Sequence, residues 1–367
     1  MSAETLIEVR NLEVRFPIKK KSLFKTEIIE LRAVDGVSFD IKQGETVGLV
    51  GESGSGKTTV GRAILRAIDP TSGTVIYHSH KGDVDMVSAT QSELQSVRPN
   101  LQMAFREGAV ELHNLAGEAL RLFRPNMSLV FQDPYSSLNP RMTVRDIIAE
   151  PLVASGLVKN REDIDRRVRE IAARCKLNLE HLRRFPHAFS GGQRQRICIA
   201  RALVSRPDFV VCDESVSALD VSIQAEIVNL LKDLQEEMGV AFLFIAHDLS
   251  VVAQISHRVA VLYVGKFVEY APTRELFFTP KHPYTNALLS AIPQADPDDD
   301  YEPIRLEGEI PNPLAAPSGC RFHTRCPYAK PKCSETEPEW REISPDHFIA
   351  CHYAEEFDFS RSNPNRN

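Results

Sequence analysis

Apolar residues alternate with polar ones near the N-terminus and gather in short continuous runs further along the chain. Residues 6–16 alternate, which predicts strands with one buried face. The largely apolar runs at 46–50, 209–212 and 241–245 are typical of parallel strands that are buried on both faces. Between the last two runs, residues 224–238 carry apolar side chains at helical spacing. Strands that alternate with helices predict an α/β fold with a mostly parallel sheet.

A glycine-rich loop follows the predicted strand at 46–50. Residues 51–58 match the phosphate-binding pattern G-x-x-x-x-G-K-[ST], and residues 59–65 predict a helix whose positive N-terminus would hold the phosphates. Lys57 is expected to reach the β- and γ-phosphates, and the Thr58 hydroxyl to ligate Mg²⁺. The alternative is a Gly/Ser-rich surface turn that matches the pattern by chance. The predicted strand before the loop and helix after it favour nucleotide binding over that alternative. The predicted nucleotide-binding residues are Gly51, Glu52, Ser53, Gly54, Ser55, Gly56, Lys57, Thr58 and Thr59.

Two further motifs carry residues suited to phosphate chemistry. The strand at 209–212 ends in Asp213 and Glu214, where a phosphate-loop enzyme needs one carboxylate to support Mg²⁺ and another to activate water. A second motif opens a helical stretch that runs to residue 204. Its first residue, Ser190, is expected to cap that helix, and the following glycines leave room for a phosphate at the positive end. This motif consists of Ser190, Gly191, Gly192 and Gln193.

Composition places the chain among ordinary globular proteins. It has 367 residues, 43% apolar and 26% charged, with a net charge of −6, which argues against a nucleic-acid partner. The N-terminus has no apolar segment typical of a secretory signal, and the longest apolar stretch, 240–246, is too short to span a bilayer. We expect a cytoplasmic protein, still able to dock on a membrane protein, whose seven cysteines do not form disulfides.

The composition changes near residue 270. Many prolines, an acidic run at 296–300 and four of the seven cysteines lie beyond it, so we place a domain boundary there. Residues 98–105 and 124–131 also resemble each other at a spacing of 26, with an amphipathic helical pattern between them. A partial duplication, an inserted helix and a coincidence all remain open for this stretch.

These motifs occur together in one order, and in that order the chain resembles the ATP-binding subunit of ABC transporters over about residues 6–270. The resemblance implies a P-loop NTPase (RecA-like) α/β core, an antiparallel β-subdomain and an α-helical signature subdomain at about 133–205, followed by a small Cys-rich C-terminal appendage (271–367). The motifs are the Walker A loop at 51–58, the Q-loop residue Gln132, the signature at 190–193, the Walker B residue Asp213 with Glu214, the D-loop at 217–220 and the switch residue His247.

The strings at 132–142 and 282–293 resemble the dipeptide/oligopeptide/nickel importer family. The signature and the residues after it, Ser-Gly-Gly-Gln-Arg-Gln-Arg, are similar to the second (F-type) ATPase of those importers. Ser215 stands where the family usually has proline, and the segment at about 78–127 is longer than usual. Because Arg106 follows Phe105 in the first of the two similar strings, we take Gln132, not Gln102, as the Q-loop residue.

The resemblance implies roles for these residues. Glu214 would polarise the attacking water and His247 would contact the γ-phosphate, while Thr58 and Gln132 would lie at Mg²⁺ with Asp213 supporting it indirectly. The signature would complete the ATP site of a second ATPase, and Asp220 would communicate across that dimer. Phe16 is a candidate for stacking on adenine and equally a candidate for the core.

The resemblance also implies partners and a place in the cell. A second ABC ATPase, giving a heterodimer, and two transmembrane permeases would bind this subunit at the cytoplasmic face of the bacterial inner membrane, and a periplasmic solute-binding protein would act indirectly. Peptides are the expected cargo, with oligosaccharide or nickel as alternatives. A non-transport soluble ABC ATPase is the less favoured function, because the chain has one nucleotide domain and no long coiled-coil insertion.

Four cysteines near the C-terminus follow the spacing C-x5-C-x6-C-x17-C. Cys320, Cys326, Cys333 and Cys351 could hold a [4Fe–4S] cluster, which the resemblance favours, or a zinc ion, and free thiols remain a third interpretation. Possible substitute ligands are His323, His347 and His352. The other cysteines, Cys175, Cys198 and Cys212, lie in predicted helix or strand and are expected in the core.

Overall fold

The centre of the fold is an eight-stranded sheet with the strand order β11-β12-β10-β9-β3-β8-β7-β6. The structure, a computed structural model, describes residues 4–22, 25–79, 108–111, 124–156, 158, 160–292 and 303–360. The strands of this sheet are β3 (Thr46–Val50), β6 (Met127–Val130), β7 (Phe209–Asp213), β8 (Ala241–Ile245), β9 (Arg258–Tyr263), β10 (Lys266–Pro272), β11 (Arg341–Ser344) and β12 (His347–Ile349). Five neighbours, β6 to β9 with β3 among them, run parallel, and β10 to β12 pair antiparallel. The predicted mostly parallel sheet is confirmed.

The central strands are apolar throughout because both of their faces are buried. Phe209 and Val211 of β7 belong to a core cluster shared with the antiparallel strands, whereas Val210 and Cys212 face a second cluster formed with the helices. Every residue of β3, β7 and β8 is buried. A strand that lies between two cores cannot show the alternation of a half-exposed strand. Cys175, Cys198 and Cys212 are buried, as predicted.

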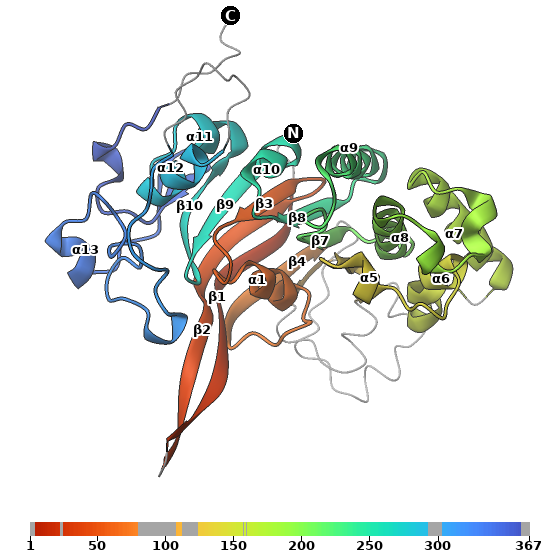
Figure 1. The fold of residues 1–367 in the computed structure, drawn as a ribbon, viewed down its shortest axis with the longest axis horizontal. Helices are drawn as coiled ribbons and strands as arrows, with labels where there is room; N and C mark the ends of the chain where they lie inside the picture. Colours follow the sequence, from red (N-terminus) through yellow and green to blue (C-terminus); the bar gives the residue numbers. More distant parts are fainter. Residues whose placement is uncertain are drawn as a thin grey trace, which may run out of the picture.

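A second, four-stranded sheet is antiparallel and has the order β2-β1-β4-β5. Its strands are β1 (Thr5–Ser22), β2 (Lys25–Lys42), β4 (Ser72–Ser79) and β5 (Gly108–Glu111). Figure 1 shows β1 and β2 as a long hairpin that extends past the body of the molecule. Part of the long segment 78–127 thus continues this sheet as β5, which pairs with β4. The first of the two similar strings, 98–105, and the helix expected after it lie outside the described residues.

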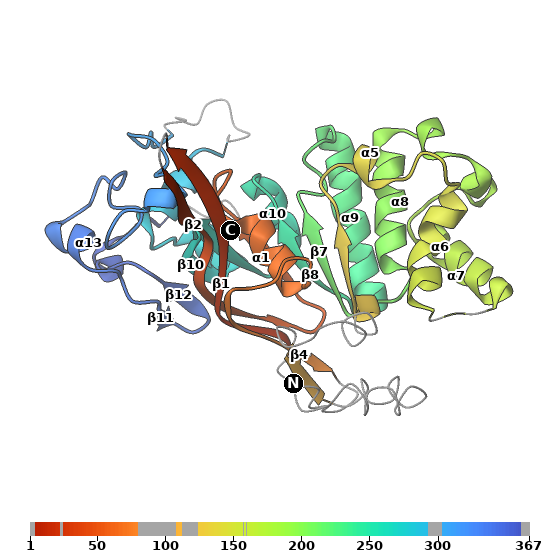
Figure 2. The same cartoon turned by 90° about the horizontal axis from the view of Figure 1, so that it is seen from below.

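Helices cover the main sheet and form a separate lobe at one end of it (Figures 1 and 2). The lobe holds α5, α6, α7 and α8. The bounds of a helical subdomain at about 133–205 stay a prediction. Polar caps set where these helices begin: Thr143 caps α6 and Asn160 caps α7. The α-helices are α1 (Lys57–Ile64), α5 (Pro134–Ser137), α6 (Val144–Ser155), α7 (Arg161–Arg174), α8 (Gly191–Leu203), α9 (Val221–Met238), α10 (Leu249–Ile255), α11 (Thr273–Phe278), α12 (Pro283–Ser290) and α13 (Pro331–Glu335). Short 3₁₀ turns lie at Arg124–Asn126, Leu179–Arg183, Pro186–Ala188, Pro313–Ala315 and Ala354–Glu356.

The C-terminal region joins the edge of the main sheet. Strand β12 pairs with β10, with Phe348 opposite Tyr270. The fully buried Glu269 accepts hydrogen bonds from the backbone N–H groups of Lys281 and His282, and its Oε1 lies 2.9 Å from His347 Nε2. The expected boundary near residue 270 falls inside β10, and the division into two domains stays a prediction. Over the part of the chain that the structure describes, no helix is long and apolar enough to cross a membrane.

Candidate functional site

The glycine-rich loop lies between the end of β3 and the start of α1. Gly51, Gly54 and Gly56 have φ angles of 151°, 77° and 108°, which side-chain-bearing residues rarely adopt. A Cβ at Gly51 would lie 2.1 Å from the Leu262 carbonyl oxygen, and one at Gly56 would lie 2.3 Å from that of Ala33. Gly56 is the N-cap of α1 and provides no side-chain hydrogen bond. The first N–H groups of α1 are therefore left to an anion or to water.

Lys57 is folded back across this loop. Its side chain is buried, and Nζ donates hydrogen bonds to the carbonyl oxygens of Gly51 at 2.8 Å and Glu52 at 3.0 Å. Burial lowers the pKa of Lys57, while the carboxylates of Glu214, Asp213 and Glu52 act in the opposite direction. The ammonium group thus sits inside the loop with two neutral carbonyls as partners, and a phosphate oxygen would be a stronger partner for it.

Two carboxylates and two polar side chains meet beside the loop. Asp213, the last residue of β7, is 2% exposed and accepts a hydrogen bond of 2.7 Å from the Thr58 hydroxyl. Gln132 Nε2, just after β6, donates to Glu214 Oε2 at 2.6 Å. Because β6 and β7 are parallel neighbours, their carboxyl ends bring these side chains to one edge of the sheet. The predicted Walker A, Walker B and Q-loop residues are therefore assembled in one place.

The backbone of Glu214 turns it out of the strand direction. Its φ angle of 47° lies in the left-handed region, which costs energy for a residue with a side chain. The conformation is held by its N–H, which donates to the Ile245 carbonyl at 2.9 Å, and by Ser217 Oγ, which donates to the Glu214 carbonyl at 2.9 Å. Sequence reasoning did not single out Arg62, whose Nη2 lies 3.5 Å from Asp213 Oδ2. The sequence signal that could have identified Arg62 is its position in the helix that directly follows the phosphate loop.

The signature residues begin α8 as predicted. Ser190 and Gln193 form a reciprocal capping box at this N-terminus. Gly192 is needed for packing, since a Cβ there would lie 2.6 Å from Ile223 of α9, whereas a Cβ at Gly191 would make an ordinary contact. Asp220 caps α9 by accepting from the Ile223 N–H at 3.0 Å. Figures 1 and 2 place α8 away from α1, across the sheet, so the signature and the phosphate loop of one chain are separate.

The two remaining candidates are His247 and Phe16. His247 is exposed just after β8, where it lines an open groove together with Val221 and Leu288. Phe16 is half-buried in β1 and packs against the core cluster between the two sheets. Its position is compatible with both predicted roles, and adenine stacking stays a prediction.

The four C-terminal cysteines line one small cavity. Burial raises the pKa of the Cys320, Cys326 and Cys351 thiols to about 11, so metal binding there would displace thiol protons. His323 and His352 also line the cavity, whereas His347 is held by Glu269. Within the described ranges, no three His, Cys, Asp or Glu side chains are already arranged around a metal position. The cysteines fit thiolate ligation in type and number.

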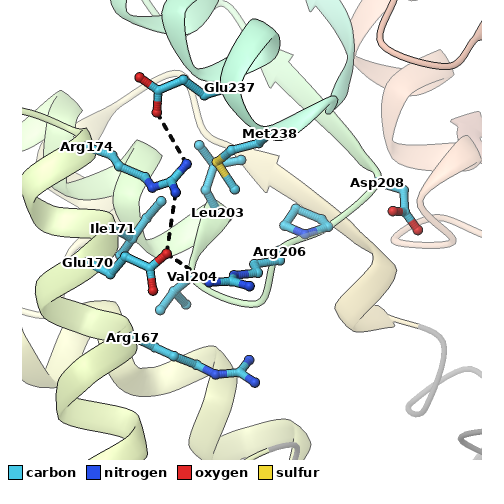
Figure 3. Close-up of a pocket in the computed structure, with 11 residues that line it drawn as sticks. Arg167, Glu170, Ile171, Arg174, Leu203, Val204, Arg206, Asp208, Glu237 and Met238 are labelled. Atoms are coloured by element: carbon cyan, nitrogen blue, oxygen red, sulfur yellow. Dashed lines mark hydrogen bonds and ion pairs between the residues drawn. The ribbon is translucent and has the colours of Figure 1, made fainter.

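A further hollow lies where α7, the segment after α8 and the end of α9 meet (Figure 3). Arg174 pairs with Glu237 at 3.2 Å and with Glu170 at 3.5 Å, and Arg206 pairs with Glu170 at 2.8 Å. These ion pairs tie α7 to the ends of α8 and α9. The charges balance within the cluster, so we assign it a structural role.

Comparisons with known proteins agree with this geometry. Residues 34–217 match the model of the family described as "ABC transporter", and residues 268–333 match "Oligopeptide/dipeptide transporter, C-terminal region". The oligopeptide transport ATP-binding protein AppF of Bacillus subtilis is 46% identical, over 95% of this chain and 97% of its own length. A putative peptide import ATP-binding protein of Brucella abortus is 45% identical, over 96% of this chain and 98% of its own.

Solved structures give the same answer for the fold. The dimeric ATP-binding cassette MJ0796, bound to ADP and Pi, aligns with a TM-score of 0.56 and 26% identity over 73% of this chain and 99% of that one. The chain therefore belongs to the ABC transporter family, and it is an ABC-type ATPase. Within that family it carries the C-terminal region of oligopeptide and dipeptide transporters.

Proposed function

We propose that this chain is the ATP-hydrolysing subunit of an importer that moves peptides across the bacterial inner membrane, where it binds at the cytoplasmic face. The observation that carries the catalytic part is the meeting of Thr58, Asp213, Gln132 and Glu214 beside the phosphate loop. The peptide cargo is supported by the C-terminal match and by relatives whose names refer to peptide or oligopeptide transport.

ATP would bind along residues 51–59 with its phosphates on the N-terminus of α1. Lys57 Nζ would exchange its two loop carbonyls for β- and γ-phosphate oxygens. Mg²⁺ would be held by Thr58 and Gln132, with Asp213 orienting Thr58, and would neutralise charge on the phosphates. Glu214 would orient and polarise the attacking water. The Gln132 amide oxygen would hold Mg²⁺, because the hydrogen bond to Glu214 uses only Nε2.

A second ATPase would complete the site. The signature residues 190–193 lie away from the loop of the same chain, which supports a head-to-tail dimer in which they meet the partner's γ-phosphate. His247 and Asp220 would lie along that interface. ATP would close the dimer only if it binds the closed state more tightly than the open one. The expected partner in this dimer is a different ATPase subunit. Two permeases would receive the motion through the region after Gln132, and a periplasmic solute-binding protein would deliver the cargo to them.

The cysteine cavity supports a bound metal in the C-terminal region. We propose a [4Fe–4S] cluster held by Cys320, Cys326, Cys333 and Cys351, with a zinc ion as the alternative. Iron, sulfide and zinc analysis of anaerobically purified protein separates these. Equal amounts of iron and sulfide support the cluster, and one zinc per chain supports the alternative. If the protein contains neither iron nor zinc, the four cysteines are free thiols.

The experiment for transport uses the assembled complex. The chain is co-expressed with its expected permeases and second ATPase, reconstituted into liposomes and assayed for ATP hydrolysis with the binding protein loaded with peptide, oligosaccharide or nickel. The proposal is supported if ATP hydrolysis is stimulated by the peptide-loaded binding protein and not by the oligosaccharide- or nickel-loaded one. Stimulation by one of the other ligands would move the cargo to that class, and hydrolysis in a chain that never joins permeases would favour a non-transport ATPase.

A further inference from the structure

Glu52, the second residue of the phosphate loop, is held through all three of its polar groups. Its carbonyl oxygen accepts from Lys57 Nζ at 3.0 Å. Its backbone N–H donates to the Tyr284 hydroxyl at 3.0 Å. Its carboxylate accepts two hydrogen bonds from Arg325, at 2.7 Å and 3.1 Å. Two of these three partners come from the C-terminal region, far beyond the residues expected to bind ATP.

The side chains of Arg325 and Tyr284 are held in place by their own surroundings. The side chain of Arg325 is 8% exposed and Tyr284 is fully buried. Tyr263, Tyr284 and Phe322 form a cluster of rings with centroid separations of 4.7 to 5.3 Å, which joins the end of β9 to the C-terminal region. A two-point arginine–carboxylate pair fixes orientation as well as distance. The loop therefore rests on a packed surface and not on a mobile tail.

A second contact runs from the same segment to the other side of the loop. Arg321 donates to the Val264 carbonyl and pairs with Asp35. The next residue after Val264 is Gly265, whose N–H donates to the Ser55 carbonyl at 2.8 Å. The short segment 320–326 thus contacts Glu52 directly and reaches Ser55 through the β9–β10 turn.

We propose that segment 320–326 braces the phosphate loop and that Arg325 and Tyr284 are positioning residues for ATP binding. The proposal rests on the assignment of residues 51–58 as the phosphate site. Holding Glu52 in place keeps the loop in the conformation that binds ATP. Because the loop is ordered before ATP binds, less free energy of binding is lost in ordering it. Because Lys57 donates to the Glu52 carbonyl, a rotation of that peptide would also move the ammonium group.

The test measures binding of a fluorescent ATP analogue to the purified full-length chain, with KM and kcat of the assembled transporter alongside. We expect Arg325→Ala to raise Kd and KM for ATP about three- to tenfold with kcat little changed. Tyr284→Phe, which removes one oxygen, should raise Kd about threefold, and Arg325→Lys should fall between wild type and Arg325→Ala. Arg341→Ala, which breaks the ion pair with Glu355 elsewhere in the C-terminal region, should leave Kd unchanged.

Two comparisons separate this brace from a general structural role. The double variant Glu52→Gln, Arg325→Ala should bind ATP no more weakly than Arg325→Ala alone, since the two residues act as one unit. A wild-type Kd in folded Arg325→Ala overturns the proposal, as does an equal loss in Arg341→Ala. If Arg325→Ala does not fold, a wild-type Kd in Tyr284→Phe overturns it. Lys57→Ala tests the loop itself: if that variant binds ATP normally, the phosphate-site assignment fails and the brace falls with it.

Discussion

The side-chain amide of Gln132 donates a hydrogen bond to the Glu214 carboxylate across 2.6 Å, joining the ends of the parallel neighbours β6 and β7. Gln132 lies at the start of the segment expected to contact a permease, and Glu214 is the expected catalytic carboxylate. The contact gives one direct route by which movement outside the expected ATP site would reorient the carboxylate that is expected to polarise water. Such coupling requires the amide of Gln132 as the donor and the carboxylate of Glu214 as the acceptor.

Glu214→Gln should retain ATP binding and lose at least about 100-fold of the turnover, because an amide is a poor base for the attacking water. Single-turnover hydrolysis and equilibrium binding of ATP measure the two effects separately. Glu226→Gln, which alters an exposed carboxylate of α9, is the matched control and should hydrolyse ATP as wild type. Unchanged turnover in Glu214→Gln would remove this residue from the role of base.

Gln132→Ala removes the expected Mg²⁺ ligand together with the hydrogen bond to Glu214. We expect kcat to fall about tenfold, less than in Glu214→Gln, since water remains available as a replacement ligand. The dependence of hydrolysis on Mg²⁺ concentration is the informative measurement. A higher Mg²⁺ requirement supports ligation, whereas lower kcat with an unchanged Mg²⁺ requirement would limit Gln132 to positioning Glu214.

Lys57→Ala should weaken ATP binding itself. Loss of the charged hydrogen bonds to the phosphates is expected to raise Kd at least about tenfold, as measured by titration with labelled ATP. Lys176→Ala, which removes an exposed lysine paired with Asp233, provides the control and should bind ATP normally. Normal affinity in Lys57→Ala would contradict the phosphate-loop assignment.

Arg258 is buried against Glu45 and Asp40, with Nε 2.6 Å from Glu45 Oε1 and Nη2 2.8 Å from Asp40 Oδ2. Arg258→Ala would leave the buried Glu45 without its positive partner, and we expect a loss of about 3 kcal/mol or more in the free energy of unfolding. The two partly exposed pairs broken by Arg174→Ala, with Glu170 and Glu237, should together cost about 1 kcal/mol. Urea unfolding of both variants checks the difference, and equal losses would show that burial of Arg258 adds nothing.

The sequence was sufficient to predict the features that depend on neighbouring residues. The strands at 46–50, 209–212 and 241–245 followed from apolar runs, and the cap at Ser190 from its place before a helix. The contact of Arg325 with Glu52 was missed because 273 residues separate them and no local pattern marks an arginine as a partner of a distant loop. The short strands β11 and β12 were missed for a similar reason: they are stabilised mainly by pairing with the edge of an existing sheet.

Buried His282 should make stability depend on pH. Burial lowers its pKa to about 4, and its Nδ1 accepts a hydrogen bond from the Tyr284 N–H at 3.0 Å, so the folded state keeps it neutral. The unfolded state takes up the proton below about pH 6.5, so the stabilisation is complete above that pH and is lost as pH falls towards 4. Between pH 7.5 and 5 we expect a contribution of about 2 kcal/mol.

His282→Asn tests this contribution, because asparagine can still cap α12 but does not titrate. Urea unfolding at pH 7.5 and pH 5 gives the free energy of unfolding at each pH. The decrease on acidification should be about 2 kcal/mol smaller in the variant than in the wild type. Equal decreases in the two proteins would show that His282 does not titrate in this way.

The most direct measurement of the whole account is uptake of labelled peptide into liposomes that contain the reconstituted transporter. The account predicts ATP-dependent uptake with wild-type protein, and loss of that uptake when this chain carries Glu214→Gln although ATP still binds. Peptide uptake that persists at the wild-type rate in the Glu214→Gln complex, or ATP hydrolysis that never moves peptide, would contradict it.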